Sequence, residues 1–401
     1  MKKSIIFSML CFAITVLFGC SQKSAGVGDH SASFIEVNET DQTEMELAKK
    51  EEMGNSVEEK SEVKVAAGWE SIPESIQDTS CETIGFEAQV TVPQVLRSGY
   101  GKSWSCEKII FDETVTEIFG INQEDVVEEN ELELDDNLLG KYIYKGITTE
   151  DGSMLSYGGH YLDYVTQEYF YITNCIDRDI RVSEYNLDRY AMDTDLDFMP
   201  YREAGEKMIA FMEKLGLTVS DQYVCYALDC DTLASQEDCT DEMGQWVKEQ
   251  EKGEWTQEDE CYLFLFHQEV EGITVSQAGY GNIMNGSGNA DSDIEIIYGQ
   301  QGIVYLRINH VYTIQEELTS MELLTADAVR DILIDAQNLI IGGNEIKVLH
   351  MEPVLLPIVV NEKKMELTPV WEIEERINYV ELGVQDYRTV HFDGSTGQEI
   401  I

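Results

Sequence analysis

The chain has few basic residues. Its 401 positions contain 27 lysines and arginines against 77 aspartates and glutamates, which gives a formal net charge of −50. A surface of this sign repels the phosphates of nucleic acids and the anionic headgroups of lipids. It attracts divalent cations, or basic patches on a partner, only in a salt-dependent way. The composition therefore excludes nucleic acid as a partner.

The chain also lacks an apolar run long enough to span a bilayer, which takes about 20 residues in a helix. Its apolar stretch Ile5–Gly19 is shorter, follows Lys2-Lys3 and ends at Cys20. Leu17-Phe18-Gly19-Cys20 is typical of a bacterial lipoprotein processing site, at which the Cys20 thiol takes a diacylglyceryl group. We therefore predict a signal peptide over 1–19. The mature protein would carry acyl chains such as palmitate on Cys20.

This prediction places the protein on the extracytoplasmic face of the cell membrane, with the lipid anchor as its sole contact with the bilayer. The alternative is an ordinary secretory signal that ends near a cysteine by chance, and it also predicts export. Removal of the signal takes away two lysines and no acid, so the net charge changes from −50 to −52.

Residues 20–68 lack the composition of a folded segment. From Ser21 to Gly68 there is one aromatic residue, Phe34, no proline, and eleven acids against five bases. Such a stretch buries too little apolar surface to offset the entropy of ordering it. We predict a disordered acidic tether.

No motif in the chain indicates catalysis. Ser287 lies in Gly286-Ser287-Gly288, which is not the GxSxG nucleophile elbow. Nothing in the sequence links it to a histidine among His267, His310, His350 and His391. The glycines of 279–288 have no lysine and no GxGxxG pattern, so a phosphate site is not expected. We predict a protein that is not an enzyme and has no cofactor, with an envelope-polymer hydrolase as the alternative.

Two acidic stretches resemble oxygen-ligand loops but lack the glycine and final glutamate of an EF-hand. They comprise Asp193, Asp195 and Asp197, and Asn289, Asp291, Asp293 and Glu295. No metal site is predicted, and a calcium- or solute-binding lipoprotein stays an alternative. A solute-binding protein would need a deep cleft between two lobes, which the short helices do not suggest.

Seven cysteines besides Cys20 belong to the mature chain, and no CxxC motif is present, so a zinc site is not expected. Export would permit disulfides. Cys225 with Cys261 and Cys230 with Cys239 are plausible pairs, but spacing does not decide between them and an all-reduced set.

From Trp69 onward the composition is that of a globular protein. Alternating apolar residues from Phe86 to Val92 predict a half-buried strand, and Asp112 and Gly120 delimit a short helix. A section rich in tyrosine follows, typical of a meander of strands. Its tyrosines are Tyr142, Tyr144, Tyr157, Tyr161, Tyr164, Tyr169 and Tyr171.

The last 200 residues contain an internal repeat. In each copy an amphipathic helix comes first, opened by Pro200 and closed by Gly216 in one copy, and capped by Thr325 in the other. Their apolar faces comprise Ala204, Met208, Phe211, Met212 and Leu215, and Val329, Ile332, Leu333, Ala336 and Ile340. Three extended segments follow each helix, at 219–228, 261–270 and 294–314, and at 346–356, 365–373 and 387–400.

The repeat predicts an α+β fold with antiparallel sheets, each covered by a helix. Two repeated helix-β-β-β units follow an N-terminal mostly-β domain. The closing hairpins turn at Gly299–Gly302 and at Asp393–Gly397.

The second copy contains Leu367-Thr368-Pro369-Val370-Trp371 and closes with Asp393-Gly394-Ser395-Thr396-Gly397-Gln398-Glu399-Ile400. With its helix, it resembles the PepSY-type modules of exported bacterial proteins, over about half of the chain. It is also similar to the YycH and YycI type of extracytoplasmic regulators. This resemblance implies a binding or regulatory role with an envelope or membrane protein as partner, such as a sensor kinase or a peptidase.

The first copy carries an acidic insert, Asp231–Glu260, with eleven acids, two lysines, Trp246 and Trp255. Tryptophans exposed on such an insert are frequent anchors of protein contacts, so Trp246 and Trp255 are the candidate binding residues. The alternative is that they attach the insert to its own sheet.

Together these observations predict a lipid-anchored envelope protein that acts through protein–protein contacts. The predicted divisions are 1–19 signal peptide, 20–68 tether, 69–195 N-terminal α+β domain, 196–316 first repeat with insert 231–260, and 317–401 second repeat.

Overall fold

The computed structural model describes residues 65–81, 83–136, 140–176, 189–241, 243–276, 293–337, 344–361, 364–380 and 382–400. All of them belong to the second of two units into which the chain divides, Lys64–Ile401. The predicted signal peptide and Cys20 lie outside the described residues.

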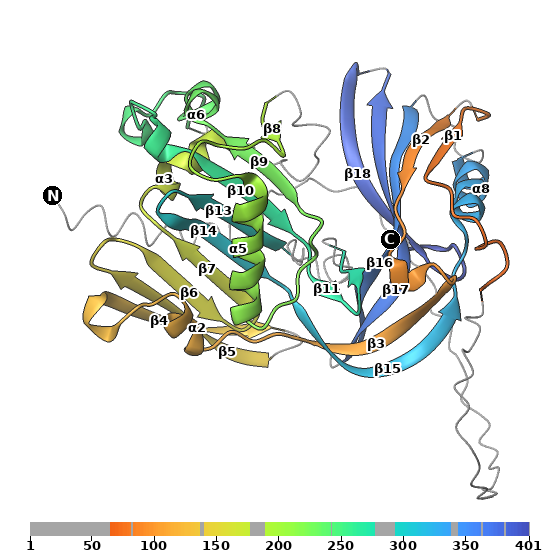
Figure 1. Cartoon of the computed structure of the whole chain (residues 1–401), viewed down its shortest axis with the longest axis horizontal. Helices are drawn as coiled ribbons and strands as arrows, with labels where there is room; N and C mark the ends of the chain where they lie inside the picture. Colours follow the sequence, from red (N-terminus) through yellow and green to blue (C-terminus); the bar gives the residue numbers. More distant parts are fainter. Residues whose placement is uncertain are drawn as a thin grey trace, which may run out of the picture. The chain divides into compact units, whose positions relative to one another are not determined.

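Within these residues the strands form an eight-stranded sheet, a nine-stranded sheet and a two-stranded ribbon (Figure 1). The eight-stranded sheet, here the terminal sheet, contains β1 (Ser75–Asp78), β2 (Ile84–Val90), β3 (Tyr100–Lys108), β15 (Tyr312–Glu322), β16 (Asn344–Asn361), β17 (Lys364–Tyr379), β18 (Val384–Asp393) and β19 (Glu399–Ile400). The nine-stranded sheet, here the central sheet, contains β4 (Val126–Asp136), β5 (Gly140–Thr149), β6 (Met154–Gly158), β7 (Tyr161–Val165), β8 (Ala191–Met192), β9 (Val224–Leu228), β10 (Cys261–Phe266), β13 (Asp293–Gly299) and β14 (Gly302–Asn309).

The ribbon is formed by β11 (Glu269–Val270) and β12 (Ile273–Thr274). The α-helices among the described residues are α2 (Thr114–Ile118), α3 (Tyr169–Ile172), α5 (Tyr201–Lys214), α6 (Cys230–Gln236) and α8 (Ala326–Gln337). The named strands of the described residues pair antiparallel, except β2 with β16. The fold is therefore α+β with mostly antiparallel sheets, as the sequence predicts.

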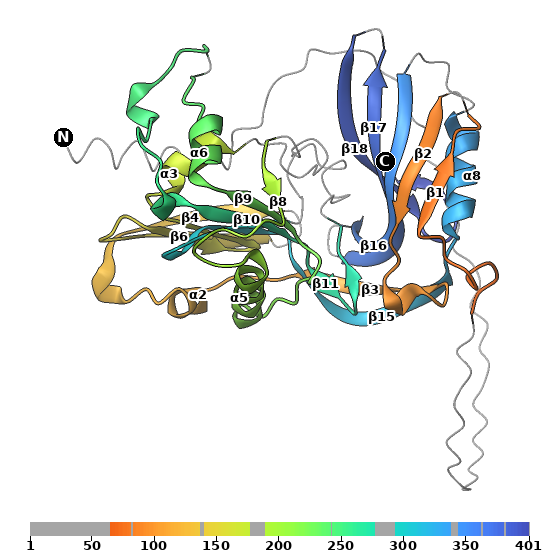
Figure 2. The same ribbon diagram turned by 45° about the horizontal axis from the view of Figure 1, so that its top comes forward.

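The central sheet is inserted into the terminal sheet along the chain. β3 leads out of the terminal sheet and β15 leads back, and the two strands pair antiparallel from Lys108 opposite Tyr312 to Tyr100 opposite Glu322. Figures 1 and 2 show these two strands side by side. The strands of the central sheet all lie between them in sequence.

This arrangement of the two sheets does not follow the predicted domain boundaries. The strands of 69–195 do not form a sheet of their own, because β1, β2 and β3 join the terminal sheet and β4 to β7 join the central sheet. β2 lies between β1 and β16, parallel to β16. A strand pairs with the edge that buries its apolar residues, whatever the distance in sequence, so a linear division misses such a pairing.

The predicted tether also ends earlier than Gly68. Ala66 and Trp69 are both buried in the core of the terminal sheet, and the Ala66 N–H donates to the carbonyl of Ser98 at 2.8 Å. Both side chains lie where a Cβ on Gly99 would be, at a backbone φ of +76°. A glycine at that position lets the chain approach this closely.

Helix α5 covers the central sheet, and its predicted bounds are confirmed. Pro200 precedes it, and Ala204, Met208 and Met212 are buried against the strands. After it, the Leu217 N–H donates to the carbonyl of Met212 at 3.0 Å. The helix forms because its apolar residues recur at a helical spacing and reach the aromatic core of β10.

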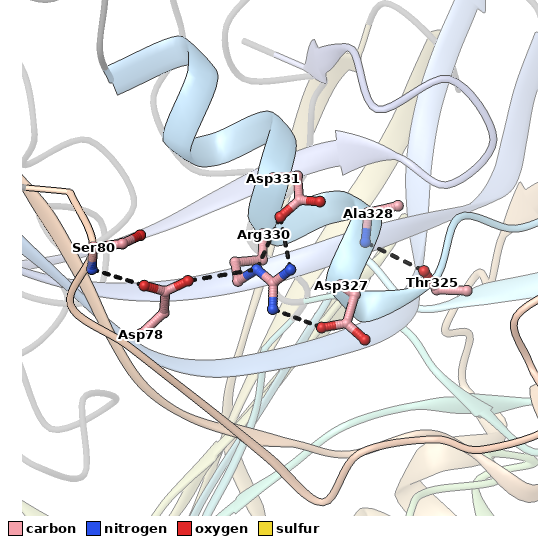
Figure 3. A network of polar contacts seen from close by, with 7 residues as sticks. All are labelled: Asp78, Ser80, Thr325, Asp327, Ala328, Arg330 and Asp331. Carbon is pink, nitrogen blue, oxygen red and sulfur yellow. Dashed lines mark hydrogen bonds and ion pairs between the residues drawn. The ribbon is translucent and has the colours of Figure 1, made fainter.

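Helix α8 packs on the terminal sheet. The Thr325 hydroxyl accepts a hydrogen bond from the Ala328 N–H at 3.2 Å, which confirms Thr325 as its cap. Figure 3 shows Arg330 reaching from α8 toward Asp78 of β1, with Nε 3.8 Å from Oδ2. Its other nitrogens bond Asp327 and Asp331 at 2.7 Å. Arg330 thus links the helix to an edge strand.

The side chains of β17 alternate between the two faces of the terminal sheet. Leu367, Trp371 and Ile373 are fully buried beneath α8. On the opposite face Val370 is also fully buried, with Val354 and other side chains of β16. Both faces of these strands are therefore buried here, rather than one face being solvated.

A stacked pair of histidines lies where β14 leads into β15. The rings of His160 and His310 are 4.2 Å apart between centroids, and His310 has a backbone φ of +51°. His160 is 1% exposed, and neither of its ring nitrogens has a hydrogen-bond partner within the described part of the chain. Burial, aided by the nearby His310 and Lys108, lowers the pKa of His160 far below its usual value. This ring is therefore neutral at physiological pH.

Candidate functional site

The acidic insert leaves and re-enters the central sheet at one point. Leu228, the last residue of β9, lies opposite Cys261, the first residue of β10. The insert starts with α6, whose cap Asp229 accepts a hydrogen bond from the Thr232 N–H at 2.7 Å. Leu233 on this helix is fully buried against the sheet. The insert is therefore a folded segment that connects two neighbouring strands.

Asn174, just after α3, holds the middle of the insert. Its carbonyl accepts from the Asp238 N–H at 2.8 Å, and its amide nitrogen lies 3.2 Å from the Gln250 carbonyl and 3.7 Å from Cys239 Sγ. Glu237 accepts a hydrogen bond from the Lys252 N–H at 2.9 Å. These bonds hold both ends of the segment between Asp238 and Gln250.

That segment forms a tight hairpin, here called the insert hairpin, Cys239–Val247. The Val247 N–H donates to the Cys239 carbonyl at 2.8 Å, and a single carboxylate oxygen of Asp241 accepts from the N–H groups of Met243 and Gln245, both at 2.9 Å. Gly244 at the turn has a φ of +73°, which glycine adopts without strain. Hydrogen bonds within the chain thereby hold the described backbone of the hairpin in this turn.

The insert hairpin exposes two large apolar side chains. Met243 is 77% exposed and Trp246 is 51% exposed. Trp255, by contrast, packs against the cluster beneath the insert, and Lys252 Nζ lies 4.7 Å from its ring centroid. The structure therefore separates the two predicted binding residues: Trp246 is presented to solvent, and Trp255 attaches the insert to its own sheet. Met243 was not predicted, because sequence spacing does not reveal exposure.

The acidic insert carries a large net negative charge. Its eleven acids and two lysines give a net charge of −9. Hydrogen bonds from Thr240 lower the pKa of Asp238. Burial raises the pKa of Asp259, but hydrogen bonds from Lys252 and Thr256 outweigh it, and the net shift is downward. The hairpin therefore presents Met243 and Trp246 within a negative field.

A second group of polar side chains lies on the terminal sheet. The Ser276 hydroxyl donates to Glu372 Oε2 at 2.5 Å, and His391 Nε2 lies 3.0 Å from both atoms. The register places Glu352, Glu372 and His391 directly opposite one another on β16, β17 and β18. Ser276 reaches them because its N–H donates to the Leu355 carbonyl at 2.8 Å. We call these four side chains the polar cluster.

The pKa values of the two carboxyl groups in the polar cluster are shifted in opposite directions. Burial, together with the charges of Glu372 and Glu374, raises the pKa of Glu352 to about 8. Burial also acts to raise the pKa of Glu372, but the hydrogen bonds and charge of His391 and the bond from Ser276 lower it overall. The surroundings therefore favour the protonated form of Glu352 and the charged form of Glu372.

The geometry of the polar cluster does not match a serine-protease relay. In that arrangement the histidine faces serine with one ring nitrogen and the carboxylate with the other. Here the same nitrogen of His391 faces both Ser276 and Glu372. Within the described ranges, no group of three or more His, Cys, Asp or Glu side chains could hold a metal ion. The hydrogen bonds of the cluster hold the Ser276 side chain against the terminal sheet.

Other candidates from the sequence have structural roles or fall outside the described residues. Asp195 accepts a hydrogen bond from the Tyr201 N–H at 3.0 Å, at the start of α5. Ser287 and the glycines of 279–288 lie outside the described residues. No helix in the described ranges is long and apolar enough to cross a membrane.

Six described cysteines are free thiols: Cys106, Cys175, Cys225, Cys230, Cys239 and Cys261. Cys225 and Cys261 lie on neighbouring strands, as expected, but Cys225 faces Phe264 and belongs to the opposite side of the sheet from Cys261. Successive residues of a strand point to alternate faces, so three positions of offset separate the two thiols. Cys230 and Cys239 are not joined either.

No protein-family model and no curated protein matches the chain. Its structure is similar to the crystal structure of an uncharacterised protein from Eubacterium rectale. The TM-score is 0.64 and the sequence identity is 16%, over 82% of this chain and 93% of that one. At this identity the likeness concerns the fold alone, and the resemblance to PepSY modules stays a prediction.

Proposed function

We propose that the chain is a lipid-anchored binding or regulatory protein of the bacterial cell envelope, without catalytic activity of its own, and that it acts through contact with another envelope protein. The observation that carries this proposal is the insert hairpin, with Met243 77% exposed and Trp246 51% exposed. Tryptophan and methionine are enriched at the cores of protein interfaces. A hairpin ordered in advance loses less entropy on binding than a flexible loop does.

The charge of the insert indicates the chemistry of its partner. With a net charge of −9, the insert is repelled by acidic surfaces and attracted to basic ones. We therefore expect the partner to offer an apolar pocket for Trp246 with lysines or arginines at its rim. An envelope protein such as a sensor kinase or a peptidase fits this expectation.

The order of elements supports the finer proposal of two repeated PepSY-like units. Helix α5 is followed by β9, β10, β13 and β14, which are neighbours in the central sheet. Helix α8 is followed by β16, β17 and β18, which are neighbours in the terminal sheet. In both cases the helix packs on a sheet that contains the strands after it.

Site-specific photo-crosslinking in intact cells tests the proposed contact. A photoreactive residue at position 243 or 246 of the full chain should form a specific adduct with one envelope protein. The same residue at Ile110, which is 61% exposed but lies outside the insert, is the matched control. Equal labelling from all three positions would count against the insert hairpin as the contact.

Point variants then test the affinity. Met243→Ser and Trp246→Ser should each weaken capture of the crosslinked partner by tenfold or more, about 1.4 kcal/mol or above. Ile110→Ser should leave capture unchanged. Deletion of 231–260 is a poorer test because it would also remove the buried Leu233 and Cys239.

The anchor needs its own experiment. Mass spectrometry of the native protein should find acyl chains on Cys20, and Cys20→Ser should release the protein from membranes. An unmodified mature terminus would leave an exported protein without the proposed anchor.

A second candidate function, hydrolysis of an envelope polymer, is favoured by the oppositely shifted carboxyl pair, Glu352 and Glu372. One neutral acid beside one carboxylate is the arrangement that general acid–base chemistry uses. Incubation of the purified chain with cell-wall fragments tests it. Turnover that is lost in Glu372→Gln would refute the binding proposal, and absence of turnover would refute the hydrolase.

A further inference from the structure

β4 is an edge strand of the central sheet. It stands at one end of the strand order, and its strand partner among the described residues is β5. The register with β5 is continuous from Glu128 to Asp136. Within the described part of the chain, no backbone hydrogen bond joins 128–134 to a segment other than β5. The outer N–H and C=O groups of 128–134 are therefore available to a further strand.

The end of the β4–β5 hairpin also lacks a third strand. β5 pairs with β6 only from Lys145 to Thr148. In the described ranges, Leu132–Asp136 and Gly140–Tyr144 therefore pair with each other and with no other strand. A two-stranded ribbon is marginally stable in water, and a third strand with an apolar face stabilises it. A strand added beside β4 would supply that neighbour.

One face of this edge is acidic. Successive residues of a strand point to opposite faces, so Glu129, Glu131 and Glu133 share a face. Glu131 lies 3.4 Å from Lys145 and Glu133 lies 2.5 Å from Lys141, both on β5. The two carboxylate side chains are still 64% and 59% exposed. Their charges are thus only partly offset by β5, and they remain accessible to basic side chains on the outer side of β4.

The other face of the edge is largely apolar. It carries Asn130, Leu132 and Leu134, which alternate with the three glutamates. Leu132 lies opposite Tyr144 on β5, and Leu134 lies opposite Tyr142. Leu132 is 42% exposed. Apolar side chains on an added strand would pack beside these leucines and remove their exposed surface from water.

A second copy of β4 does not fit this edge. In a two-fold antiparallel pair, residues directly opposite each other lie on the same face. Every odd-numbered residue from 129 to 135 is an acid. A pair centred anywhere from 129 to 134 therefore places an acid opposite an acid, which destabilises it. The acids protect the edge against self-association and leave it open to a strand of opposite charge.

We propose that β4 binds an extended segment of a partner protein in which basic residues alternate with apolar ones, and that this segment joins the central sheet as a strand beside 128–134. Its basic side chains would lie beside the three glutamates, and its apolar side chains beside the two leucines. Main-chain hydrogen bonds give such a contact its affinity, and alternate side chains give it selectivity. The insert hairpin, which follows β9, takes no part in this contact.

A designed peptide tests the proposal on the purified full chain. The probe has seven residues, alternately valine and lysine, with lysine at the second, fourth and sixth positions. Fluorescence anisotropy at low salt should give a dissociation constant of about 10–100 µM, which should rise with salt. The control peptide has the same four valines and three lysines in two blocks, and it should bind at least about tenfold more weakly. Equal binding of the two peptides would overturn the proposal, because attraction to a chain of net charge −50 would then explain both.

Methylation of the peptide backbone tests whether the contact is a strand. The alternating peptide with every backbone nitrogen methylated keeps its charges and side chains but donates no main-chain hydrogen bond. It should bind at least about tenfold more weakly than the unmethylated probe. Unchanged binding would overturn the addition of a strand to β4.

A charge reversal locates the contact. The double variant Glu129→Lys with Glu131→Lys changes two exposed residues of β4, so it should fold normally and bind the alternating peptide at least about tenfold more weakly. The matched control is Glu206→Lys with Glu213→Lys, the same change in net charge at two exposed positions of α5, and it should bind within about twofold of the wild type. Circular dichroism checks that both variants are folded. Equal weakening in the two variants would refute the assignment to β4.

Discussion

His160 makes the stability of the fold depend on pH in a way that one substitution should remove. Its ring is buried, stacked on His310, and without a hydrogen-bond partner for either nitrogen in the described part of the chain. Its pKa is therefore lowered in the folded state from the ordinary value of 6.5. Below pH 6.5 the unfolded chain binds a proton at this position, and the folded chain does not.

The sign and size of the effect follow from proton linkage. The stability associated with neutral His160 is fully present above pH 6.5 and is lost as the pH falls toward the folded-state pKa. Each pH unit in that window costs about 1.36 kcal/mol per proton. Between pH 7.5 and pH 4.5 the loss is about 2.7 kcal/mol, because the folded-state pKa lies well below this range. His160→Phe keeps a stacked ring and removes the contribution of this histidine to the pH dependence of stability.

Urea denaturation at pH 7.5 and at pH 4.5 measures the effect. The 77 acids also titrate, so the informative quantity is the difference between the wild type and His160→Phe in the stability lost between the two pH values. We expect the variant to lose about 2.7 kcal/mol less than the wild type. Tyr161→Phe, a change at a ring 4.0 Å from His160, should lose as much as the wild type. Equal losses for His160→Phe and the wild type would refute the reasoning.

Three further predictions concern single side chains. Glu352, with a pKa of about 8 in the fold against 4.5 unfolded, favours unfolding increasingly as pH rises from 4.5 to 8. Glu352→Gln should therefore gain stability relative to the wild type between pH 5 and pH 8 in urea titrations, and an unchanged difference would disprove the shift. Arg330→Met removes ion pairs with the exposed Asp327 and Asp331 and a longer contact with Asp78, so thermal unfolding should show a loss of no more than about 1 kcal/mol. Gly205→Ala raises helix propensity by about 1 kcal/mol, but its methyl group would overlap the ring of Tyr223. Overpacking of about 1–3 kcal/mol should outweigh the gain, and a raised melting temperature would contradict this.

Several local features could be predicted because they depend on neighbours in sequence. The helix after Pro200, the cap at Thr325 and the turn at Gly299–Gly302 are confirmed. The alternation on β2 is also confirmed, with Phe86, Ala88 and Val90 buried. Most of the tyrosine-rich section forms β5, β6 and β7, although Tyr169 and Tyr171 lie in α3. Periodicity and capping are local, so the chain itself encodes them.

The candidate sites were predictable only in part. Composition located the acidic insert, and the insert lies between neighbouring strands, as the repeat predicts. Which tryptophan is exposed depends on the packing of Trp255 beneath the insert, which no spacing rule reports. The polar cluster was missed because Ser276 is far in sequence from β16, β17 and β18, and because spacing alone does not give the register of those strands. The sequence features that pointed to this cluster were the alternating glutamates on β17 and the histidine on β18.

The sequence by itself determined the acidity of the surface, the positions of the main helices and turns, and the α+β class, since each depends on composition or on residues a few positions apart. The tertiary structure alone decided that β1 to β3 join the strands at the far end of the chain, and that the central sheet is inserted between β3 and β15. It also decided that Ser276, Glu352, Glu372 and His391 meet. Strand pairing depends on which apolar faces and backbone edges can be buried together. The entropy cost of closing a loop grows only slowly with its length, so segments far apart in sequence can pair as well as near ones.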